Sequence, residues 1–380
     1  MKLDSLSLSS GSTNRCTLIV DGNWLLMSRA IQMAPYLTDN RPDIDTHAGH
    51  LLSTMHRSLV SACHTLTPVD NVLIVADARS WRKDVPDPIT GQYTYKDNRH
   101  RQQDALALDW TKIYGVFDTF CTQCENTLHV PVVRCAGAEG DDQIYFWARA
   151  LTAHDTSCVI WSSDRDLQQL VHTDAEHHSF TVWYEQKAGL VCPDTLAPPT
   201  DLLSTMLGPV GLRESQLFVE LLARVGKKAV YINPVSIVLT KMLAGDKSDH
   251  IEPVFTWETT SRHCGIGPKD AEKLIDLCGS PSSPADMDPN ALYSALNNIK
   301  KFASRHPVYE NIAARLDYNR KMVWLDESQI PEAVRVGIYN GEYGYADMTA
   351  LRAGVCINDV PAPNQSACDD WNLFGNPVKK

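Results

Sequence analysis

The sequence contains no apolar run that approaches the ~18 residues of a transmembrane helix. Its N-terminus is polar and serine-rich and lacks the apolar segment of a secretory signal peptide. Its 11 cysteines are scattered, and the single CxxC motif at Cys121–Cys124 has no second pair at zinc-site spacing. These absences predict a protein that is neither secreted nor inserted in a membrane, with free cysteines in a reducing cytosol.

The chain also lacks a positive net charge. It has 35 basic and 46 acidic residues, which give a formal net charge of −11. Taken alone, this balance argues against a polyanionic partner. The hydrophobic content of 43% and charged content of 21% are typical of globular proteins, and 380 residues can bury a full core. We therefore expect a globular chain with about two domains.

Acidic residues are concentrated in one stretch of the chain. Three of them stand at the start of a helical pattern of apolar residues, and two more directly follow the short buried strand predicted at 158–161. Acids that cap a helix and solvate a loop would explain this pattern, but so many converging carboxylates would also suit a bound cation. The five are Glu139, Asp141, Asp142, Asp164 and Asp166.

Aspartates also end two earlier apolar segments. Thr17–Val20 is followed by Asp21, and Val72–Ala76 is followed by Asp77. Short β-branched runs separated by helical patterns predict a parallel α/β sheet, in which ligands bind at the carboxyl ends of the strands. Asp21, Asp77 and Asp164 would then lie along one edge of the sheet, which favours a metal site over simple helix capping.

The most basic part of the chain lies at residues 79–105. Prolines and a glycine divide it, which predicts a protruding loop or arch. A solvated surface loop would explain its composition, but bases interleaved with aromatic residues are also what binding of a single nucleic-acid strand requires. Its basic residues include Arg79, Arg82, Lys83, Lys96, Arg99 and Arg101, and its aromatic residues include Trp81, Tyr93 and Tyr95.

A third acidic group follows the apolar segment 235–243, and a glycine-rich turn leads from there into a helix. Backbone amides at such a turn and helix start can hold a phosphate without reading bases. The residues concerned are the acids Asp246 and Asp249, the turn residues Gly265 and Gly267, and Pro268, Lys269 and Lys273 in the helix.

The remaining segments indicate less. A strand is expected at 181–184 and helices at 45–63, at 216–225 and over most of 290–350, while residues 172–235 suggest no chemistry. The tail from about 354 contains prolines and the cluster Asp369–Gly375. Such a cluster after a polar linker is typical of a docking peptide, although packing onto its own domain would explain it equally.

Taken in order, these motifs resemble those of the 5′-nuclease superfamily, the flap endonucleases and 5′→3′ exonucleases, and most of all its phage members of the RNase H type. Any one motif is a weak signal, but eight in the same order make the resemblance specific. The matching segments are Ile19–Gly22, Val75–Asp77, Trp81–Asp84, Tyr95–Arg99, Glu139–Asp142, Ser162–Gln168, Gly245–Asp249 and Gly265–Gly267.

The resemblance implies an α/β fold in two domains. A PIN-like parallel-sheet nuclease domain would span residues 12–235, with the basic arch at about 79–105. A helical helix-hairpin-helix (H3TH-type) domain that binds duplex would span 236–350, and 351–380 would form a C-terminal tail.

The resemblance also implies two Mg²⁺ ions, for which Mn²⁺ can substitute, and a K⁺ ion at the hairpin. Carboxylates and water, without His or Cys ligands, suit magnesium. Nine of the 46 acids would belong to the site, so the rest of the chain carries a net charge of only −2 and a nucleic-acid partner becomes acceptable. Carried over by position, the first ion is surrounded by Asp21, Asp77, Glu139 and Asp141, the second by Asp164, Asp166, Asp246 and Asp249, with Asp142 near either.

Further roles follow from the same resemblance. Lys96 and Arg99 match the cations of the family that contact the scissile phosphate, and Arg82 would help to position the strand. The expected nucleic-acid contacts are Tyr95, Arg101, Gly265, Gly267, Lys269 and Lys273.

The sequence departs from the family pattern at several places. Gly140 stands where alanine is usual, Arg165 where lysine is usual, and both changes are expected to be tolerated. Residues 255–264 are inserted before the hairpin turn, in the region that would hold K⁺ and duplex, and the tail has no counterpart.

From the resemblance we expect a Mg²⁺-dependent 5′→3′ exonuclease and flap endonuclease that removes RNA primers and 5′ flaps in DNA replication or repair. One alternative is a catalytically weak binder of branched DNA, but an acid is present at every metal-site position of the family, which favours the enzyme. Another is a PIN-type ribonuclease, which would lack the Gly245–Gly267 unit that this chain contains. The expected partners are branched or nicked DNA, RNA–DNA duplex, and a sliding clamp or single-strand-binding protein at the tail. The protein is expected to be a monomer of the cytoplasm (the host cytoplasm if viral).

Overall fold

The computed structural model describes residues 15–38, 43–97, 106–198, 215–226, 229–258, 263–299, 302 and 312–340. Arg99 and Arg101, the last residues of the expected arch and the expected tail at 351–380 lie outside these residues.

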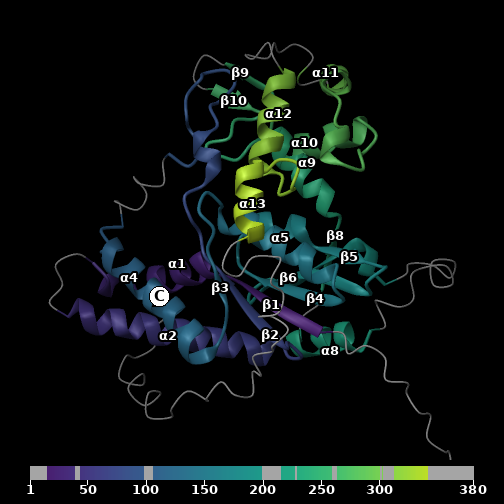
Figure 1. Cartoon of the computed structure of the whole chain (residues 1–380). Helices are drawn as coiled ribbons and strands as arrows, with labels where there is room; N and C mark the ends of the chain where they lie inside the picture. Colours follow the sequence, from purple (N-terminus) through teal and green to yellow (C-terminus); the bar gives the residue numbers. More distant parts are fainter. Residues whose placement is uncertain are drawn as a thin grey trace, which may run out of the picture.

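A mostly parallel sheet forms the centre of the larger part of the molecule (Figure 1). Its strands are ordered β3-β2-β1-β4-β6-β7-β8, with β5 paired to β6. The strands β3, β2, β1, β4 and β6 are parallel, whereas β7 and β5 run antiparallel to β6. The strands are β1 (Arg15–Asp21), β2 (Asn71–Val75), β3 (Val132–Val133), β4 (Thr156–Trp161), β5 (His172–Asp174), β6 (Ser179–Glu185), β7 (Gly189–Pro193) and β8 (Val230–Ile232).

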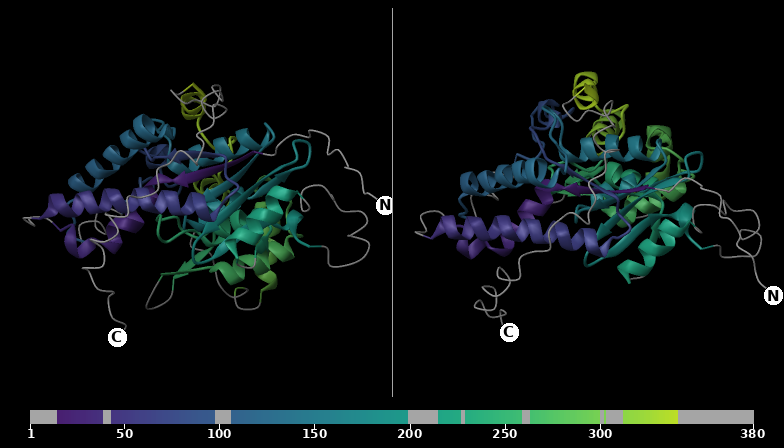
Figure 2. Two further views of the ribbon diagram at one scale, coloured as in Figure 1. Left: turned by 90° about the horizontal axis from the view of Figure 1, so that it is seen from below. Right: turned by 60° about the horizontal axis from the view of Figure 1, so that its bottom comes forward.

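Helices cover both faces of this sheet because its strands are apolar on both sides. In β1, Leu18 and Val20 pack into the core on one face and Ile19 into the core on the other, as the two-residue period of a strand requires. The first face is covered by α1 (Gly22–Gln32), α2 (Ile44–Thr65), α4 (Trp110–Leu128) and α8 (Gln216–Val225). The second is covered by α5 (Gly140–Thr152) and α13 (Glu332–Asn340). The views of Figure 2 show α2 and α4 side by side along the sheet.

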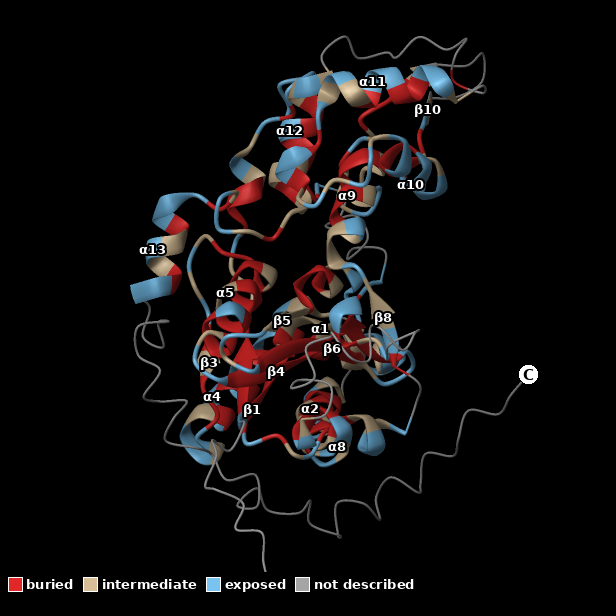
Figure 3. Cartoon of the chain, turned by 90° about the vertical axis from the view of Figure 1, so that its right-hand side faces the viewer, coloured by how far each residue is buried: buried red, intermediate tan, exposed pale blue. Residues whose placement is uncertain are grey.

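A second, mainly helical region has its own core, and Figure 3 colours the buried residues red along its helices. It consists of α9 (Pro234–Ala244), α10 (Pro268–Leu277), α11 (Pro289–Asn298) and α12 (Ile312–Val323). The predicted insertion before the hairpin turn forms a small antiparallel sheet of β9 (Thr256–Glu258) and β10 (His263–Gly265). Short 3-10 helices are η1 (Ala34–Tyr36), η2 (Trp81–Asp84), η3 (Arg165–Leu170), η4 (Asp194–Leu196) and η5 (Pro284–Asp286).

Buried polar contacts join the helical region to the sheet region. Arg315 on α12 is fully buried and binds both carboxylate oxygens of Asp87, at 2.5 and 2.9 Å. The side chain of Gln169 donates to the Val323 carbonyl and accepts from the Leu325 amide. Helix α13 packs in the core on the α5 face of the sheet, although the sequence assigns it to the duplex-binding domain.

The architecture confirms the expected α/β class with a mostly parallel sheet followed by helices. Cys121 and Cys124 lie buried on α4, a helix that the sequence analysis does not predict, and the nine described cysteines are all free. None of the helices among the described residues has the length and apolar character needed to cross a membrane.

Candidate active site

The predicted aspartates do follow neighbouring parallel strands. Asp21 is the last residue of β1, and Asp77 and Asp164 come shortly after the adjacent strands β2 and β4. The Asp21 carboxylate accepts hydrogen bonds from the Trp24 amide at 2.9 Å and from the Ser162 hydroxyl at 2.7 Å. Asp21 therefore caps α1 and also lies at the sheet edge, so helix capping and convergence of acids are both present.

Asp77 lies against the start of α5. Its carboxylate accepts a 2.5 Å hydrogen bond from the Gly140 amide. A Cβ atom at position 140 would lie 2.7 Å from the same oxygen, which is closer than a carbon atom can approach without a shift. The glycine that departs from the family pattern thus lets the carboxylate reach an amide at the positive end of the helix.

Six of the nine predicted acids line a single pocket of about 500 Å³. Trp24 and Met27 of α1, Lys96 and the hydroxyl residues Ser163 and Ser248 also line it. The acids are Asp21, Asp77, Glu139, Asp141, Asp164 and Asp249. Of the other three, Asp142 is fully buried, while Asp166 and Asp246 form an adjacent group described below.

Burial and mutual repulsion raise the pKa of two acids in the pocket. Burial, followed by the charge of Asp77, raises the pKa of Asp21 to about 7. Burial, followed by the charge of Asp164, raises the pKa of Asp141 well above its usual value. Because each carboxylate is ionised only at a cost beside its neighbours, a cation in this pocket would be stabilised.

Glu139 differs from its neighbours because it is surrounded by hydrogen-bond donors. Lys96 donates to its carboxylate at 2.6 Å, the Tyr95 hydroxyl at 3.0 Å and Arg82 at 3.0 Å. Burial alone would raise the pKa of Glu139, but Lys96 and Arg82 outweigh it and lower the pKa to about 2. Lys96 also lies 3.5 Å from the carboxylate of Asp249, so its ammonium group links two acids from distant parts of the chain.

Arg82 lies inside the protein rather than on the expected arch surface. It is 1% exposed and donates to both oxygens of the buried Asp142, at 2.8 and 3.0 Å, and to the Met322 carbonyl at 3.1 Å. Trp81 donates to the same Asp142 carboxylate at 3.0 Å. Arg82 therefore holds both Glu139 and Asp142 at the start of α5. Through the Met322 carbonyl it also joins the start of α5 to the helical region.

Lys241, at the end of α9, lies between Asp166 and Asp246. Its ammonium group forms an ion pair with Asp166 and a 2.6 Å hydrogen bond with Asp246. Burial and the charge of Asp164 raise the pKa of Asp166 to about 6 in spite of this contact. For Asp246 burial also acts to raise the pKa, but the hydrogen bonds from Lys241 and Ser248 outweigh it, so its pKa is lowered.

The loop that carries Asp246 and Asp249 depends on Gly245. This glycine has a φ of +68°, and a Cβ atom there would lie 2.3 Å from the Ile251 carbonyl oxygen. The loop closes through paired hydrogen bonds between Asp246 and Ile251. The backbone carbonyl of Asp249 accepts from the Lys96 amide at 3.1 Å, which fixes the loop beside the pocket.

The expected hairpin residues lie away from this pocket. Gly267 is the N-cap of α10, which begins at Pro268 as predicted, and Lys269 and Lys273 are exposed one turn apart on that helix. A Cβ atom at Gly265 would lie 2.5 Å from the Pro253 ring, so this glycine allows β10 to pass close to the loop before it. Tyr95, expected to contact nucleic acid, is 5% exposed and faces Glu139 instead.

Sequence reasoning missed two contributors, Ser162 and Lys241. Ser162 stands between β4 and Asp164, inside a motif that was recognised only for its aspartates. Lys241 precedes Asp246 by five residues, and its position in the last turn of α9 is the one signal that would have placed it beside the acids that follow.

The donor set fits a hard divalent cation. The pocket offers carboxylates and hydroxyl groups, without histidine or cysteine among its described lining residues, and this is the chemistry that magnesium and manganese prefer. Within the described parts of the chain, no group of three or more His, Cys, Asp or Glu side chains is arranged so that it could hold a metal ion as it stands. Lys96 and Lys241 occupy positions among the acids that cations would otherwise take.

Comparison with known proteins agrees with this geometry. Residues 16–195 match the family described as 5′-3′ exonuclease, N-terminal resolvase-like domain. No curated protein sequence matches the chain significantly.

Among solved structures, the chain is similar to a bacteriophage T5 protein co-crystallised with metal ions, with 16% identity and a TM-score of 0.49 over 91% of this chain and 98% of that one. It is also similar to a bacteriophage T5 flap endonuclease in a pseudo-enzyme-product complex with DNA and metal ions, with 17% identity and a TM-score of 0.48 over 89% and 98%.

Proposed function

We propose that this chain, whose residues 16–195 match the 5′-3′ exonuclease N-terminal domain, is a member of the 5′-nuclease superfamily and acts as a metal-dependent 5′→3′ exonuclease and flap endonuclease. The observation that best supports this proposal is the convergence of six carboxylates and Lys96 on one pocket at the carboxyl edge of a parallel sheet. Its substrates would be 5′ flaps of DNA and RNA primers paired to DNA, cut during replication or repair.

Two Mg²⁺ ions are the cofactors that the donor chemistry suits, and Mn²⁺ would replace them. Asp21, Asp77, Glu139 and Asp141 would hold the first, and Asp164, Asp166, Asp246 and Asp249 the second. When bound, the ions supply a hydroxide nucleophile and neutralise charge on the scissile phosphate and the leaving oxygen. A K⁺ ion at the hairpin belongs to the same proposal.

Lys96 is proposed to bind the scissile phosphate. Its ammonium group is held within the pocket by Glu139 and Asp249, so it is already desolvated and oriented before the substrate arrives. Cations that replace its charge on Glu139 would free it to donate to a phosphate oxygen as negative charge develops there. Arg99, outside the described residues, is proposed to act with it.

Arg82 is proposed as a positioning residue and not as a direct contact to the strand. It holds Glu139 and Asp142 through a buried network, so it fixes the direction in which the Glu139 carboxylate faces the pocket. Asp142 would act through Arg82 in the same way, since it is 0% exposed and binds Trp81 and Arg82.

The domain division and the remaining nucleic-acid contacts are also proposals. Residues 12–235 would form the nuclease domain with its arch at about 79–105, and 236–350 the duplex-binding domain, where Lys269 and Lys273 present two exposed charges on one side of α10. Tyr95 would support the site through Glu139, and Arg101 would contact the strand. The tail at 351–380 is proposed to dock on a sliding clamp or single-strand-binding protein. If a protein that lacks residues 366–380 still pulls down both partners as well as the full chain does, this proposal is excluded.

The proposal is tested with a 5′-labelled flap and with a nicked RNA–DNA duplex. Both should be cut in Mg²⁺ and left intact in EDTA, and the product lengths should distinguish exonuclease from endonuclease activity. Tight binding of flap DNA without any cleavage in Mg²⁺ or Mn²⁺ would instead favour the alternative, a catalytically weak binder of branched DNA.

A further inference from the structure

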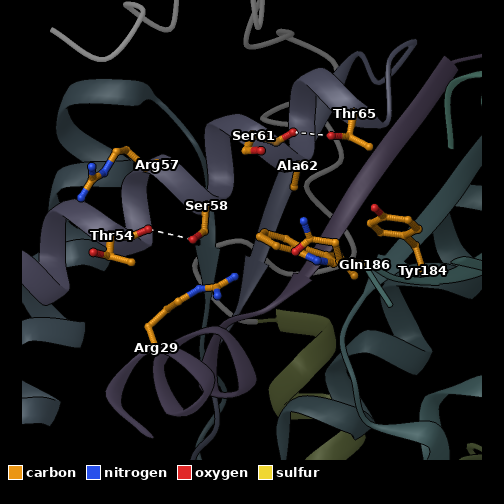
Figure 4. A pocket seen from close by; sticks show the side chains of 10 residues that line it. Arg29, Thr54, Arg57, Ser58, Ser61, Ala62, Thr65, Tyr184 and Gln186 are labelled. Carbon is orange, nitrogen blue, oxygen red and sulfur yellow. Dashed lines mark hydrogen bonds between the residues drawn. The ribbon is translucent and has the colours of Figure 1, made fainter. Parts of the chain in front are cut away.

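A second pocket, of about 340 Å³, lies outside the acidic site between α1, α2 and the ends of β4 and β6. Arg29 comes from α1, Arg57 and the hydroxyl residues Ser58 and Ser61 from α2, and Trp161 from β4. Figure 4 shows Arg29 extended from α1 toward Ser58, so that its guanidinium group enters the space between the two helices.

The charge of this pocket is opposite to that of the rest of the protein. None of the described residues that line it is acidic, and two are arginines, in a chain whose net charge is −11. Arginine offers a planar set of donors that matches the oxygens of a phosphate, and the Ser61 hydroxyl group can rotate to donate as well. The pocket therefore presents donors and positive charge to an anion.

Arg29 is incompletely satisfied within the described part of the chain. Its terminal nitrogen donates to Gln32 at 3.2 Å, but its Nε is buried and has no hydrogen-bond partner there. Burial lowers the pKa of this guanidinium group, because the charge has lost part of its hydration. A partly desolvated cation with an unused donor is costly unless an anion joins it.

The second pocket adjoins the acidic one. Trp24 lines the acidic pocket and Trp161 lines the second, and the two rings pack edge to face at 5.4 Å. Ser162, the residue after Trp161, donates to Asp21 in the acidic pocket. One nucleic-acid strand that crosses α1 from Trp24 toward Arg29 would therefore meet both pockets.

We propose that Arg29 and Arg57 bind a phosphate group of the nucleic-acid substrate, at a point separate from the bond that is cut. This proposal rests on the proposed function, since the family acts on nucleic acid. The site would add affinity and register without taking part in the chemistry, because contacts to phosphate position a strand and do not react with it.

The test compares Arg29→Gln, Arg57→Gln and the double variant with wild type, and uses Arg149→Gln as the matched control. Arg149 is exposed on α5, on the other face of the sheet, so its replacement removes the same charge away from the pocket. Binding of labelled 5′-flap DNA is measured in EDTA over a range of salt concentrations, and melting temperatures verify that each variant is folded.

We expect each pocket variant to weaken binding on the order of tenfold. The slope of log affinity against log salt should fall by about 1 in the double variant, as for the loss of one phosphate contact. The single-turnover cleavage rate at saturating substrate should stay unchanged, and Arg149→Gln should behave like wild type. An unchanged slope and affinity in the folded double variant, with wild type still cutting the flap, would overturn the phosphate site alone. A wild-type protein that neither binds nor cuts would instead overturn the proposed function.

Titration with inorganic phosphate separates the two sources of this chemistry. If the phosphate belongs to the nucleic acid, inorganic phosphate should compete only weakly for the pocket. The slope of log affinity against log salt should then change in the double variant. If inorganic phosphate raises the melting temperature of wild type but not of the double variant, while the salt slope is unchanged, a free phosphate is the ligand and the nucleic-acid assignment is overturned.

Discussion

The ammonium group of Lys96 lies 2.6 Å from the Glu139 carboxylate, inside the pocket that five further acids line. This contact joins a residue of the basic loop to the N-cap of α5. It explains why Glu139 remains ionised while burial and repulsion raise the pKa of Asp21 and Asp141 nearby. A fixed cation therefore stands within the acidic pocket before any metal or substrate is bound.

Replacement of Lys96 by methionine should slow single-turnover cleavage by about 10²–10³-fold, the usual effect of losing one donor to a developing charge. Binding of the flap substrate should weaken far less, because other contacts to the strand remain. The comparison of rate with affinity is the measurement. If the cleavage rate and the affinity fall by the same factor, Lys96 contributes only to binding of a phosphate and not to the cleavage step.

Replacement of Arg82 by methionine should lower the free energy of unfolding by about 3–5 kcal/mol, because Asp142 would stay buried without its partner. Urea unfolding measures this loss. Arg79→Met is the matched control: Arg79 pairs with Asp84 at the exposed surface, so little change is expected. A similarly small change for Arg82→Met would show that the buried network does not support the fold.

Replacement of Lys241 by methionine should raise the affinity of the metal-free protein for Ca²⁺. The ammonium group between Asp166 and Asp246 competes with a bound cation, and its loss leaves two carboxylates without a partner charge. We expect an increase of at least about tenfold, equivalent to about 1.4 kcal/mol, in calorimetric titration.

Lys247→Met provides the control for that experiment, since Lys247 is exposed on the same loop and its loss changes the net charge equally. It should alter the affinity for Ca²⁺ only slightly. An affinity in Lys241→Met that equals or falls below that of wild type would contradict competition by the ammonium group.

His172 should make stability depend on pH. Burial and the charge of Arg149 lower its pKa to about 4 in the folded protein, against about 6.5 when unfolded. The unfolded chain therefore binds a proton that the native protein does not, so the stabilisation is present above pH 6.5 and is lost as the pH falls toward 4.

Between pH 7 and pH 5, wild type should lose up to about 2 kcal/mol more of its unfolding free energy than His172→Gln does. Glutamine does not titrate and keeps a polar group near Thr152 and the Leu170 carbonyl. Urea unfolding at the two pH values measures the difference. If wild type and His172→Gln lose the same unfolding free energy between the two pH values, a group other than His172 is responsible for the pH dependence.

The sequence predicts the parts of the site that depend on neighbours along the chain. Asp21, Asp77 and Asp164 could be placed together because each lies at or shortly after the end of a strand of a parallel sheet, and parallel strands end at a common edge. The helix at Pro268 could be placed because proline is suited to a first helical turn. These inferences need only local patterns and one topological rule.

Contacts between distant segments could not be predicted in this way. Arg82 lies in a basic stretch whose composition is typical of a solvated surface loop. It is nevertheless buried, because it binds Asp142 and the Met322 carbonyl, which come from two other parts of the chain. Lys241 reaches Asp166 only because α9 packs against η3. Helix α4 was missed although its Phe117 and Phe120 are in the main core.

The central claim, that the converging carboxylates perform metal-dependent cleavage at 5′ ends, is tested most directly by Asp141→Asn. Asp141 lines the pocket, and no hydrogen bond or ion pair ties it to another of the described residues, so its replacement should leave the fold intact. We predict that wild type cuts a 5′-flap in Mg²⁺ and that the variant, with similar affinity for the flap in EDTA, is slower by about 10³-fold or more. Full activity of Asp141→Asn in Mg²⁺ would contradict the account.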